Sequence, residues 1–509
     1  RAVAAEPKLA RAWLGKARVL ARLGRKDEAA AAAAQAAAAD PHLGLAYLIQ
    51  ARIADGAGER ERAVALYRTA LKQDARVELP ARLGLGQDLL ALDELKAAEE
   101  QGAQMVKRFP AAPHGYFVRG VARYRQKRFE DAVADLQKCL AKAPDHPGAE
   151  FYLALAQYQR KQWQQALAAA KALQAQRPGL KPVEMLLAEL LLRTGDPKGA
   201  EKQARQALAL APDSAFLYRV LGAALVAQGK GEAGAEALEK AQELAPDEKL
   251  EFAIGDLYLS MNDLEKAAAR FEAAAAAHPE DRGAQIRLFY TRLRQRDFDG
   301  ALGLMDDLLL KQPGDPLWLN LKGAALLAKK DEKGAEATWR GVTQDRPELP
   351  AAHLNLAGLY ERQKRWGEAR KEYELVLAAK PKHSVAHRQL AVLDLREGKL
   401  DEAVAHLQAS LAAQPDARVA LVLSSAWLQK GDRDKAVAAA DRATEIAPNL
   451  AAAWLQAGVL HLAQGDLKGG EARLRKATEL DPKSAVAWYQ LGGVAARQKR
   501  WDEARAHLK

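Results

Sequence analysis

The sequence has little cysteine, few aromatic residues and no long hydrophobic run. Its one cysteine, Cys139, excludes an intrachain disulfide and a zinc site built from several cysteines. No apolar run reaches the roughly 18 residues of a transmembrane helix. The 9 Phe, 9 Trp and 12 Tyr are few for 509 residues, and alanine is abundant. We therefore expect helices that pack closely through small side chains, and the predicted fold class is all-α.

A strong excess of one charge is also missing. Lys and Arg outnumber Asp and Glu by 77 to 66, which gives a net charge of +11. Positive and negative residues are mixed within nearly every 34-residue stretch, so the surface is only mildly basic. Such a balance does not by itself indicate a nucleic-acid partner, and none is expected.

Prolines punctuate the whole chain at a nearly constant interval. Successive gaps are 34 residues, apart from two gaps of 33 and one of 69, in which Ala75 stands in the place of a proline. Each proline follows a helical run, and a second break comes about twelve residues later. The period predicts about 15 antiparallel pairs of helices, here helix A and helix B, each of roughly 12–14 residues. The prolines are Pro7, Pro41, Pro110, Pro144, Pro178, Pro212, Pro246, Pro279, Pro313, Pro347, Pro381, Pro415, Pro448 and Pro482.

Two columns of small residues set the phase of the repeat. Near the start of helix B, a small residue indicates that two backbones approach closely. A larger side chain there should lower the stability of the fold by about 1–3 kcal/mol. In helix A, a Gly or Ala follows a bulky residue at i, i+4 spacing, as with Trp454 and Gly458, so both lie on one face. The helix B column comprises Ala29, Ala63, Ala98, Ala132, Ala166, Ala200, Gly234, Ala267, Ala301, Ala335, Ala369, Ala403, Ala436, Gly470 and Ala504.

These columns resemble the tetratricopeptide repeat signature. The resemblance is carried by Trp454, Ala457, Gly458, Gly470, Leu474, Ala477 and Pro482, and again by Tyr218, Leu221, Gly222, Gly234, Leu238, Ala241 and Pro246. It implies an α-solenoid, a right-handed superhelix of helix pairs whose A helices line the concave side. The match is weaker around Gln285–Arg292, where Phe289 stands in place of a small residue, so the resemblance does not predict the helix packing there.

The same phase divides the chain into one continuous array, 1–509. Residues 1–9 are read as a partial repeat, 10–484 as full repeats and 485–509 as a truncated repeat. Joining Lys509 to Arg1 would continue an uninterrupted helix B. This match suggests a whole number of turns from a longer array, with head-to-tail stacking of chains, a homo-oligomer, as an alternative. Terminal repeats usually need polar caps, and neither end shows one.

No motif of catalysis or cofactor binding survives comparison with the repeat. Gly229–Gly234 matches a dinucleotide-binding glycine pattern, but a helix A precedes it where that motif needs a strand. His383 and His387 have the spacing of a metal pair, with His353 and His406 nearby, yet no further ligand completes a set, so packing or surface histidines are expected. Cys139 is expected to be a buried thiol. The chain is predicted to be no enzyme, with no cofactor and no metal.

The inward positions of helix A are the predicted partner-binding site. Aromatic residues there lie off the face that packs helix A against helix B, so part of each ring should be exposed in the concave groove. An aromatic groove suits an extended peptide or an amphipathic helix. The alternative is that neighbouring helices cover the rings. The residues are Phe117, Tyr124, Phe151, Tyr158, Phe216, Phe252 and Tyr290.

A second candidate surface is a basic edge formed by the A–B turns. Three turns repeat a Gln-Lys-Arg-aromatic tetrad, which could attract an acidic polymer or lipid headgroups. The alternative is a solvated turn whose aromatic packs over the helix pair. The basic residues are Lys127, Arg128, Arg294, Arg296, Lys364, Arg365, Lys499 and Arg500.

The resemblance implies a non-catalytic scaffold that binds a peptide or partner protein. The alanine- and arginine-rich tandem repeats also resemble bacterial repeat proteins of envelope and exopolysaccharide systems, including the large lipoproteins of the PEP-CTERM/exosortase system. This resemblance implies a role in assembling an envelope or secretion system and a periplasmic or cell-envelope location. One alternative is a targeting arm of a larger enzyme such as a glycosyltransferase, and another is binding of an anionic polymer along the basic turns.

Overall fold

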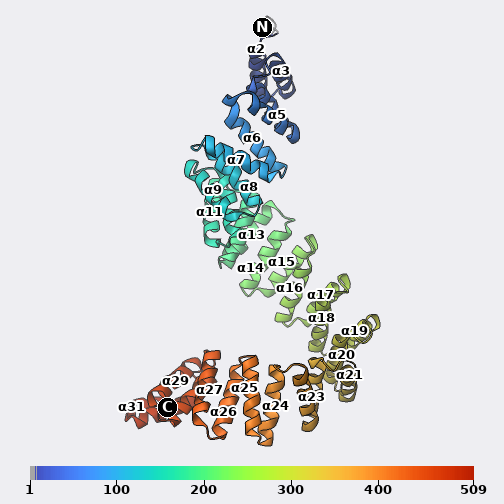
Figure 1. Cartoon of the computed structure of the whole chain (residues 1–509), viewed down its shortest axis with the longest axis vertical. Coiled ribbons are helices and arrows are strands. Elements are labelled where there is room, and N and C mark those ends of the chain that lie inside the picture. Colours follow the sequence, from blue (N-terminus) through green and yellow to red (C-terminus); the bar gives the residue numbers. More distant parts are fainter. Residues whose placement is uncertain (1–5, 7, 509) are drawn as a thin grey trace. The chain divides into compact units, whose positions relative to one another are not determined.

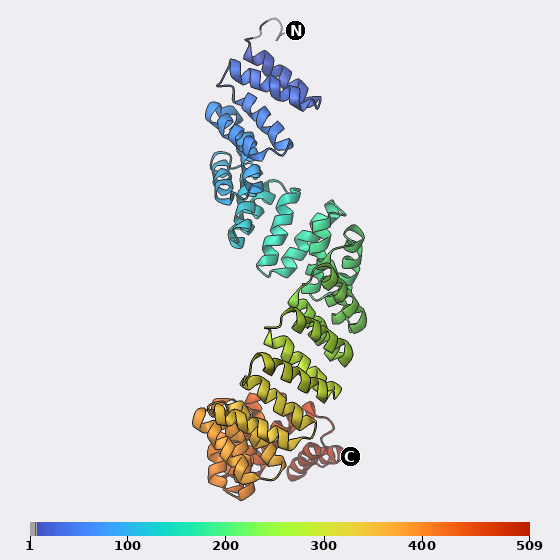
Figure 2. The same cartoon turned by 90° about the vertical axis from the view of Figure 1, so that its right-hand side faces the viewer.

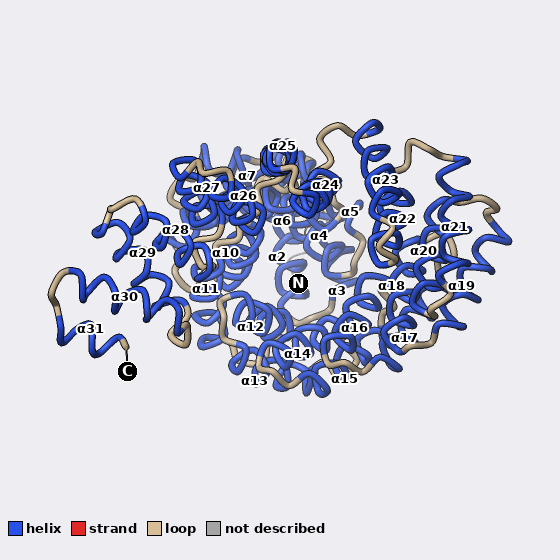
Figure 3. Tube along the Cα trace, turned by 90° about the horizontal axis from the view of Figure 1, so that it is seen from below, coloured by secondary structure: helices blue, strands red, loops and turns tan. Residues whose placement is uncertain are grey.

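The computed structural model describes residue 6 and residues 8–508. Within them the chain forms α-helices joined by short turns, with one 3₁₀ turn, η1 (Ala75–Val77), and no strand (Figure 3). Even-numbered helices are the A helices and odd-numbered helices the B helices of the predicted repeat. Within each of the two units defined below, successive helices pack side by side (Figure 1). The predicted all-α solenoid is therefore confirmed. None of the described helices combines the length and apolar character needed to cross a membrane.

Two compact units divide the chain, Arg1–Ala274 and Ala275–Lys509, with the boundary inside α17 (Leu264–Ala277). The first unit contains α2 (Ala10–Arg22), α3 (Lys26–Ala39), α4 (Gly44–Gly56), α5 (Arg60–Gln73), α6 (Glu78–Ala91), α7 (Leu95–Arg108), α8 (Pro113–Arg125), α9 (Phe129–Lys142), α10 (Pro147–Gln159), α11 (Trp163–Gln176), α12 (Lys181–Arg193), α13 (Pro197–Leu210), α14 (Ala215–Ala227), α15 (Gly231–Leu244) and α16 (Glu248–Ser260). In Figure 2 this unit is coloured from blue to green.

The second unit continues the same alternation of A and B helices. It contains α18 (Arg282–Gln295), α19 (Phe298–Lys311), α20 (Pro316–Ala328), α21 (Glu332–Asp345), α22 (Pro350–Arg362), α23 (Trp366–Ala379), α24 (Ser384–Glu397), α25 (Leu400–Ala413), α26 (Ala417–Gln429), α27 (Arg433–Ile446), α28 (Ala451–Ala463), α29 (Leu467–Leu480), α30 (Ala485–Arg497) and α31 (Trp501–His507).

Both predicted columns of small residues lie at close helix contacts. The alanines of the helix B column are fully buried, apart from Ala504 at 5% exposure. A Cβ built on Gly470 would lie 2.5 Å from Leu462 Cδ2 and 3.0 Å from the carbonyl oxygen of Gly458. In helix A, a Cβ on Gly222 would lie 2.6 Å from Leu238 Cγ of the following helix B. The small residues thus let helices A and B of one repeat approach, as the sequence predicts.

Phe289 is accommodated within this packing. Helix α18 runs without interruption through the weakly matching segment, and Phe289 is fully buried. Its core cluster includes Ala301 and Met305 of α19. Met305 stands where other repeats place Phe271 or Trp339, since each is the eighth residue of its helix B. In other repeats a small residue of helix A faces a large ring of helix B. Here the large ring of Phe289 lies on helix A, and the flexible side chain of Met305 faces it from helix B.

The bulky column of helix A also ties helix A to the preceding turn. Indole Nε1 of Trp454 donates to the carbonyl oxygen of Pro448 at 2.8 Å, and that of Trp488 donates to Pro482 at 3.0 Å. Histidine takes the same place in two repeats, where Nε2 of His353 and of His387 lies 3.0 and 2.9 Å from the carbonyl oxygens of Pro347 and Pro381. A ring N–H therefore holds the B–A turn in each of these repeats.

Candidate partner-binding surface

Four of the predicted groove aromatics lie on α8 and α10 and are half-buried. Phe117, Tyr124 and Phe151 each contact Tyr152, with ring centroids 6.4, 5.5 and 5.8 Å apart. Phe117 also packs against His146 at 4.5 Å. Tyr152, at a position that the repeat pattern does not mark, therefore joins the three rings into one cluster. Its position next to Phe151 is the only sequence signal that could have indicated it.

Tyr158 is held by contacts at both ends of its ring. The ring packs against Trp163 at 5.0 Å, and the hydroxyl donates to Glu189 Oε1 at 3.1 Å. Burial, reinforced by the Glu189 carboxylate, raises the pKa of Tyr158. The neighbouring repeats thus cover part of the predicted groove aromatics and leave the remainder of each ring at the surface.

The other groove residues are separate from this cluster. Phe216 packs at the edge of a core cluster formed by α12, α13, α14 and α15 and is half-buried. Phe252 is also half-buried, on α16. Tyr290 belongs to the second unit, where its ring contacts Phe289 and is 52% exposed. Phe117, Tyr124, Phe151 and Tyr152 therefore form the compact part of the candidate site.

The arginines of the predicted basic edge form ion pairs. Arg128 contacts Glu99 at 2.9 Å and Asp131 at 2.6 Å. Arg365 contacts Glu336 at 3.0 Å and Glu368 at 2.5 Å. Arg500 repeats the arrangement with Glu471 at 2.7 Å and Glu503 at 2.5 Å. In each case one carboxylate belongs to the preceding helix B, so these arginines link neighbouring repeats.

The lysines of the same turns occupy a special backbone position. Lys127, Lys364 and Lys499 have φ values of 64°, 60° and 60°, as does Arg296 with 63°. Every A–B turn has one residue in this left-handed region, and in seven turns that residue is glycine. Arg294 lies within the last turn of α18. In each tetrad, the lysine therefore forms the left-handed turn and the arginine forms an ion pair with the preceding repeat.

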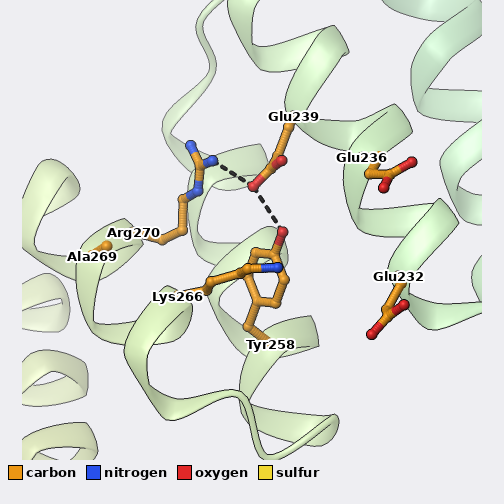
Figure 4. Close-up of a pocket in the computed structure, with 7 residues that line it drawn as sticks. All are labelled: Glu232, Glu236, Glu239, Tyr258, Lys266, Ala269 and Arg270. Atoms are coloured by element: carbon orange, nitrogen blue, oxygen red, sulfur yellow. Dashed lines mark hydrogen bonds and ion pairs between the residues drawn. The ribbon is translucent and has the colours of Figure 1, made fainter.

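A polar cavity of about 590 Å³ lies between α15, α16 and α17. Glu239 Oε1 accepts a hydrogen bond from the Tyr258 hydroxyl at 2.8 Å and pairs with Arg270, as Figure 4 shows. Lys266 Nζ lies 5.1 Å from the centre of the Tyr258 ring. Burial, followed by Glu239, raises the pKa of Tyr258 to about 12. Tyr258 and Arg270 both bind the carboxylate of Glu239, so the polar groups of this cavity serve the contact between neighbouring repeats.

The other residues that the sequence offered as candidates for cofactor binding, metal binding or catalysis have structural roles in the repeat. Gly229 forms the A–B turn with φ 77°, and α14 precedes it, so the glycine pattern is not in a strand–helix context. Cys139 is fully buried, and burial raises the pKa of its thiol to about 11, so it is a packing residue as predicted. His383 accepts a hydrogen bond from its own helix, from the backbone N–H of Ala386.

Two family models match the chain, and both are described as tetratricopeptide repeat. One matches residues 1–43, 50–113, 185–249, 388–451 and 455–509, and the other matches 123–190, 258–325 and 326–393. No curated protein sequence matches.

The solved structures that match this chain include three that cover different shares of it. The structure of Naa15/Naa10 bound to HypK-THB shares 15% identity, with a TM-score of 0.41, over 99% of this chain and 88% of that chain. MamA from Desulfovibrio magneticus RS-1 shares 23% identity, with a TM-score of 0.31, over 33% of this chain and 95% of that chain. A thermophilic tetratricopeptide repeat protein, TTC0263 from Thermus thermophilus, shares 24% identity, with a TM-score of 0.29, over 36% of this chain and 100% of that chain.

Proposed function

Because the chain belongs to the tetratricopeptide repeat family, whose repeats serve as protein-interaction scaffolds, we propose that it captures a peptide segment of a partner protein on the A helices α8 and α10. The observation that carries this proposal is the cluster of Phe117, Tyr124, Phe151 and Tyr152. These half-buried rings are held in place by mutual contacts. Burying the rest of each ring under a partner supplies binding energy at little cost in side-chain order.

The preferred occupant is a segment with apolar or aromatic anchors, either extended or helical. Hot spots of protein interfaces are enriched in large aromatic residues set in well-packed surroundings, which is the situation of this cluster. The basic edge is not part of the proposal, because Arg128, Arg365 and Arg500 already pair with carboxylates. The envelope role, the enzyme-arm alternative, binding of an anionic polymer and head-to-tail stacking stay predictions from the sequence.

A displayed library of random peptides, each about 16 residues long, tests the proposal. Peptides selected on the full chain should carry apolar anchors, and Phe117→Ala with Phe151→Ala should weaken their binding at least tenfold while helical circular dichroism is retained. Tyr290→Ala, which removes an exposed ring of the second unit, is the matched control and should leave binding unchanged. Selected peptides that bind equally well to the double variant would show that the cluster is not the site.

A further inference from the structure

Two imidazoles meet between helices A and B of one repeat in the second unit. His387 lies on α24 and His406 on α25, with their Nδ1 atoms 3.0 Å apart and their ring centroids separated by 5.3 Å. Nε2 of His387 lies 2.9 Å from the carbonyl oxygen of Pro381. A carbonyl oxygen only accepts, so this Nε2 carries the proton, and Nδ1 of the neutral ring presents a lone pair.

The hydrogen bond between the rings leaves a neighbouring carboxylate unsatisfied. It places the proton of neutral His406 on Nδ1, so that its Nε2 is an acceptor. That Nε2 faces Asp394 Oδ2 at 3.8 Å. Asp394 is fully buried; its Oδ1 accepts from Arg370 at 2.8 Å, whereas Oδ2 accepts no hydrogen bond. Two acceptors therefore face each other, and such an unsatisfied buried oxygen is costly.

A metal ion between the two Nδ1 atoms removes this mismatch. The metal would take the place of the proton, which moves to Nε2 of His406 and there points at Asp394 Oδ2. Both rings would then ligate through Nδ1 and donate Nε2–H to a carbonyl or carboxylate, which is how histidine ligands of metal sites are usually oriented. We propose that His387 and His406 bind a divalent late transition metal, with the carbonyl of Pro381 and the carboxylate of Asp394 orienting the two rings.

The separation of the nitrogens indicates which metals fit. With metal–nitrogen bonds of about 2.0–2.1 Å, two ligands lie about 2.9 Å apart in adjacent positions of a square plane and about 3.4 Å apart in a tetrahedron. The observed 3.0 Å is closer to the first, which Cu²⁺ and Ni²⁺ favour. The rings now meet end-on, so each must turn toward a common point. Among the described residues no set of three such ligands converges, so water would complete the coordination.

The chain's own repeats supply matched variants. In the preceding repeat the equivalent pair is His353 and Glu372, whose Nδ1 and Oε2 atoms lie 2.6 Å apart. In the last repeat the equivalent pair is Trp488 and His507, with ring centroids 5.1 Å apart. His406→Glu and His387→Trp therefore reproduce natural pairs of the same array, and each leaves a single imidazole. Both variants should fold as the wild-type chain does.

Calorimetric titration of the chelator-treated full chain with Cu²⁺ tests the site. We expect one Cu²⁺ per chain to bind at least tenfold more tightly to the wild type than to His406→Glu or His387→Trp, and to raise the unfolding midpoint of the wild type only. Ni²⁺ should bind the same site more weakly. His383→Ala removes the histidine one turn before His387 and should leave binding intact. Equal Cu²⁺ binding by the wild type and both pair variants would overturn the proposal.

Discussion

At the residue scale, the packing depends on small side chains that face large ones. Gly222 of helix α14 faces Leu238 of α15, and Gly255 of α16 faces Phe271 of α17 at 2.5 Å from a built Cβ. For Gly222 the neighbours also include the backbone oxygen of Gly234, 2.9 Å from the built Cβ. Backbone cannot move aside as a flexible side chain can, so this position tolerates no added volume.

Gly222→Ala is expected to destabilise the first unit. The added methyl group overpacks the contact and lowers the free energy of unfolding by about 1–3 kcal/mol. The better helix propensity of alanine offsets about 1 kcal/mol of this loss. The midpoint of urea unfolding followed by circular dichroism should therefore fall. Gly358→Ala is the control, since Gly358 lies inside α22 with nothing within 4 Å of a built Cβ, and it should raise stability by about 0.5–1 kcal/mol. An unchanged midpoint for Gly222→Ala would contradict the close-contact role.

At the element scale, each helix A ends in the same left-handed turn. After α8 the backbone N–H of Lys127 donates to Tyr124 O at 2.9 Å, and that of Arg128 donates to Arg123 O at 2.9 Å. These are the two hydrogen bonds of a Schellman motif, whose left-handed residue is usually glycine. Eight of the turns use a residue other than glycine, and Lys127 is one of them.

Lys127→Gly should stabilise the chain. A left-handed residue with a Cβ costs about 1–2 kcal/mol, whereas the extra freedom that glycine loses on folding costs about 0.5–1 kcal/mol. The net gain is up to about 1.5 kcal/mol and would appear as a higher urea midpoint. Lys138→Gly, at an exposed position inside α9, should instead cost about 1 kcal/mol. A loss of stability for Lys127→Gly would show that its side chain matters more than its backbone.

At the scale of the whole molecule, charged residues link several repeats to the one before. The pairs Arg128–Glu99, Arg365–Glu336 and Arg500–Glu471 recur at one position of the repeat. Stability of a repeat array is approximately a sum over repeats and their nearest-neighbour interfaces. The mixed charge of the sequence thus serves contacts between repeats, in addition to keeping the surface polar.

Arg365→Glu is expected to weaken the interface between two repeats. It replaces attraction to Glu336 and Glu368 by repulsion, and because the side chain is 32% exposed the loss should be about 1 kcal/mol. The effect on the unfolding midpoint should shrink with added salt. Lys364→Glu changes the adjacent charge at an exposed turn position and should leave the midpoint nearly unchanged. Equal effects of the two variants would indicate a diffuse charge effect.

The candidate partner-binding surface was harder to predict from the sequence than the fold. The predicted groove residues Phe117, Tyr124 and Phe151 do come together, but Tyr152, which joins them, follows Phe151 at a position that the periodic pattern does not mark. The basic edge was visible as a repeated tetrad, whereas the partner of Arg128, Glu99, lies 29 residues earlier in another repeat. Contacts of this kind depend on how far one repeat is rotated against the next.

The sequence by itself determined the helices, their pairing and the columns of small residues, because these follow from local propensity and a period of 34 residues. Only the tertiary structure decided which side chains of adjacent helices and repeats face one another. His387 stands at i, i+4 from His383 in the sequence, yet its ring nitrogen meets His406, 19 residues away on the next helix. Periodicity repeats each position once per unit, whereas side-chain partners arise from the packing angle between neighbouring helices.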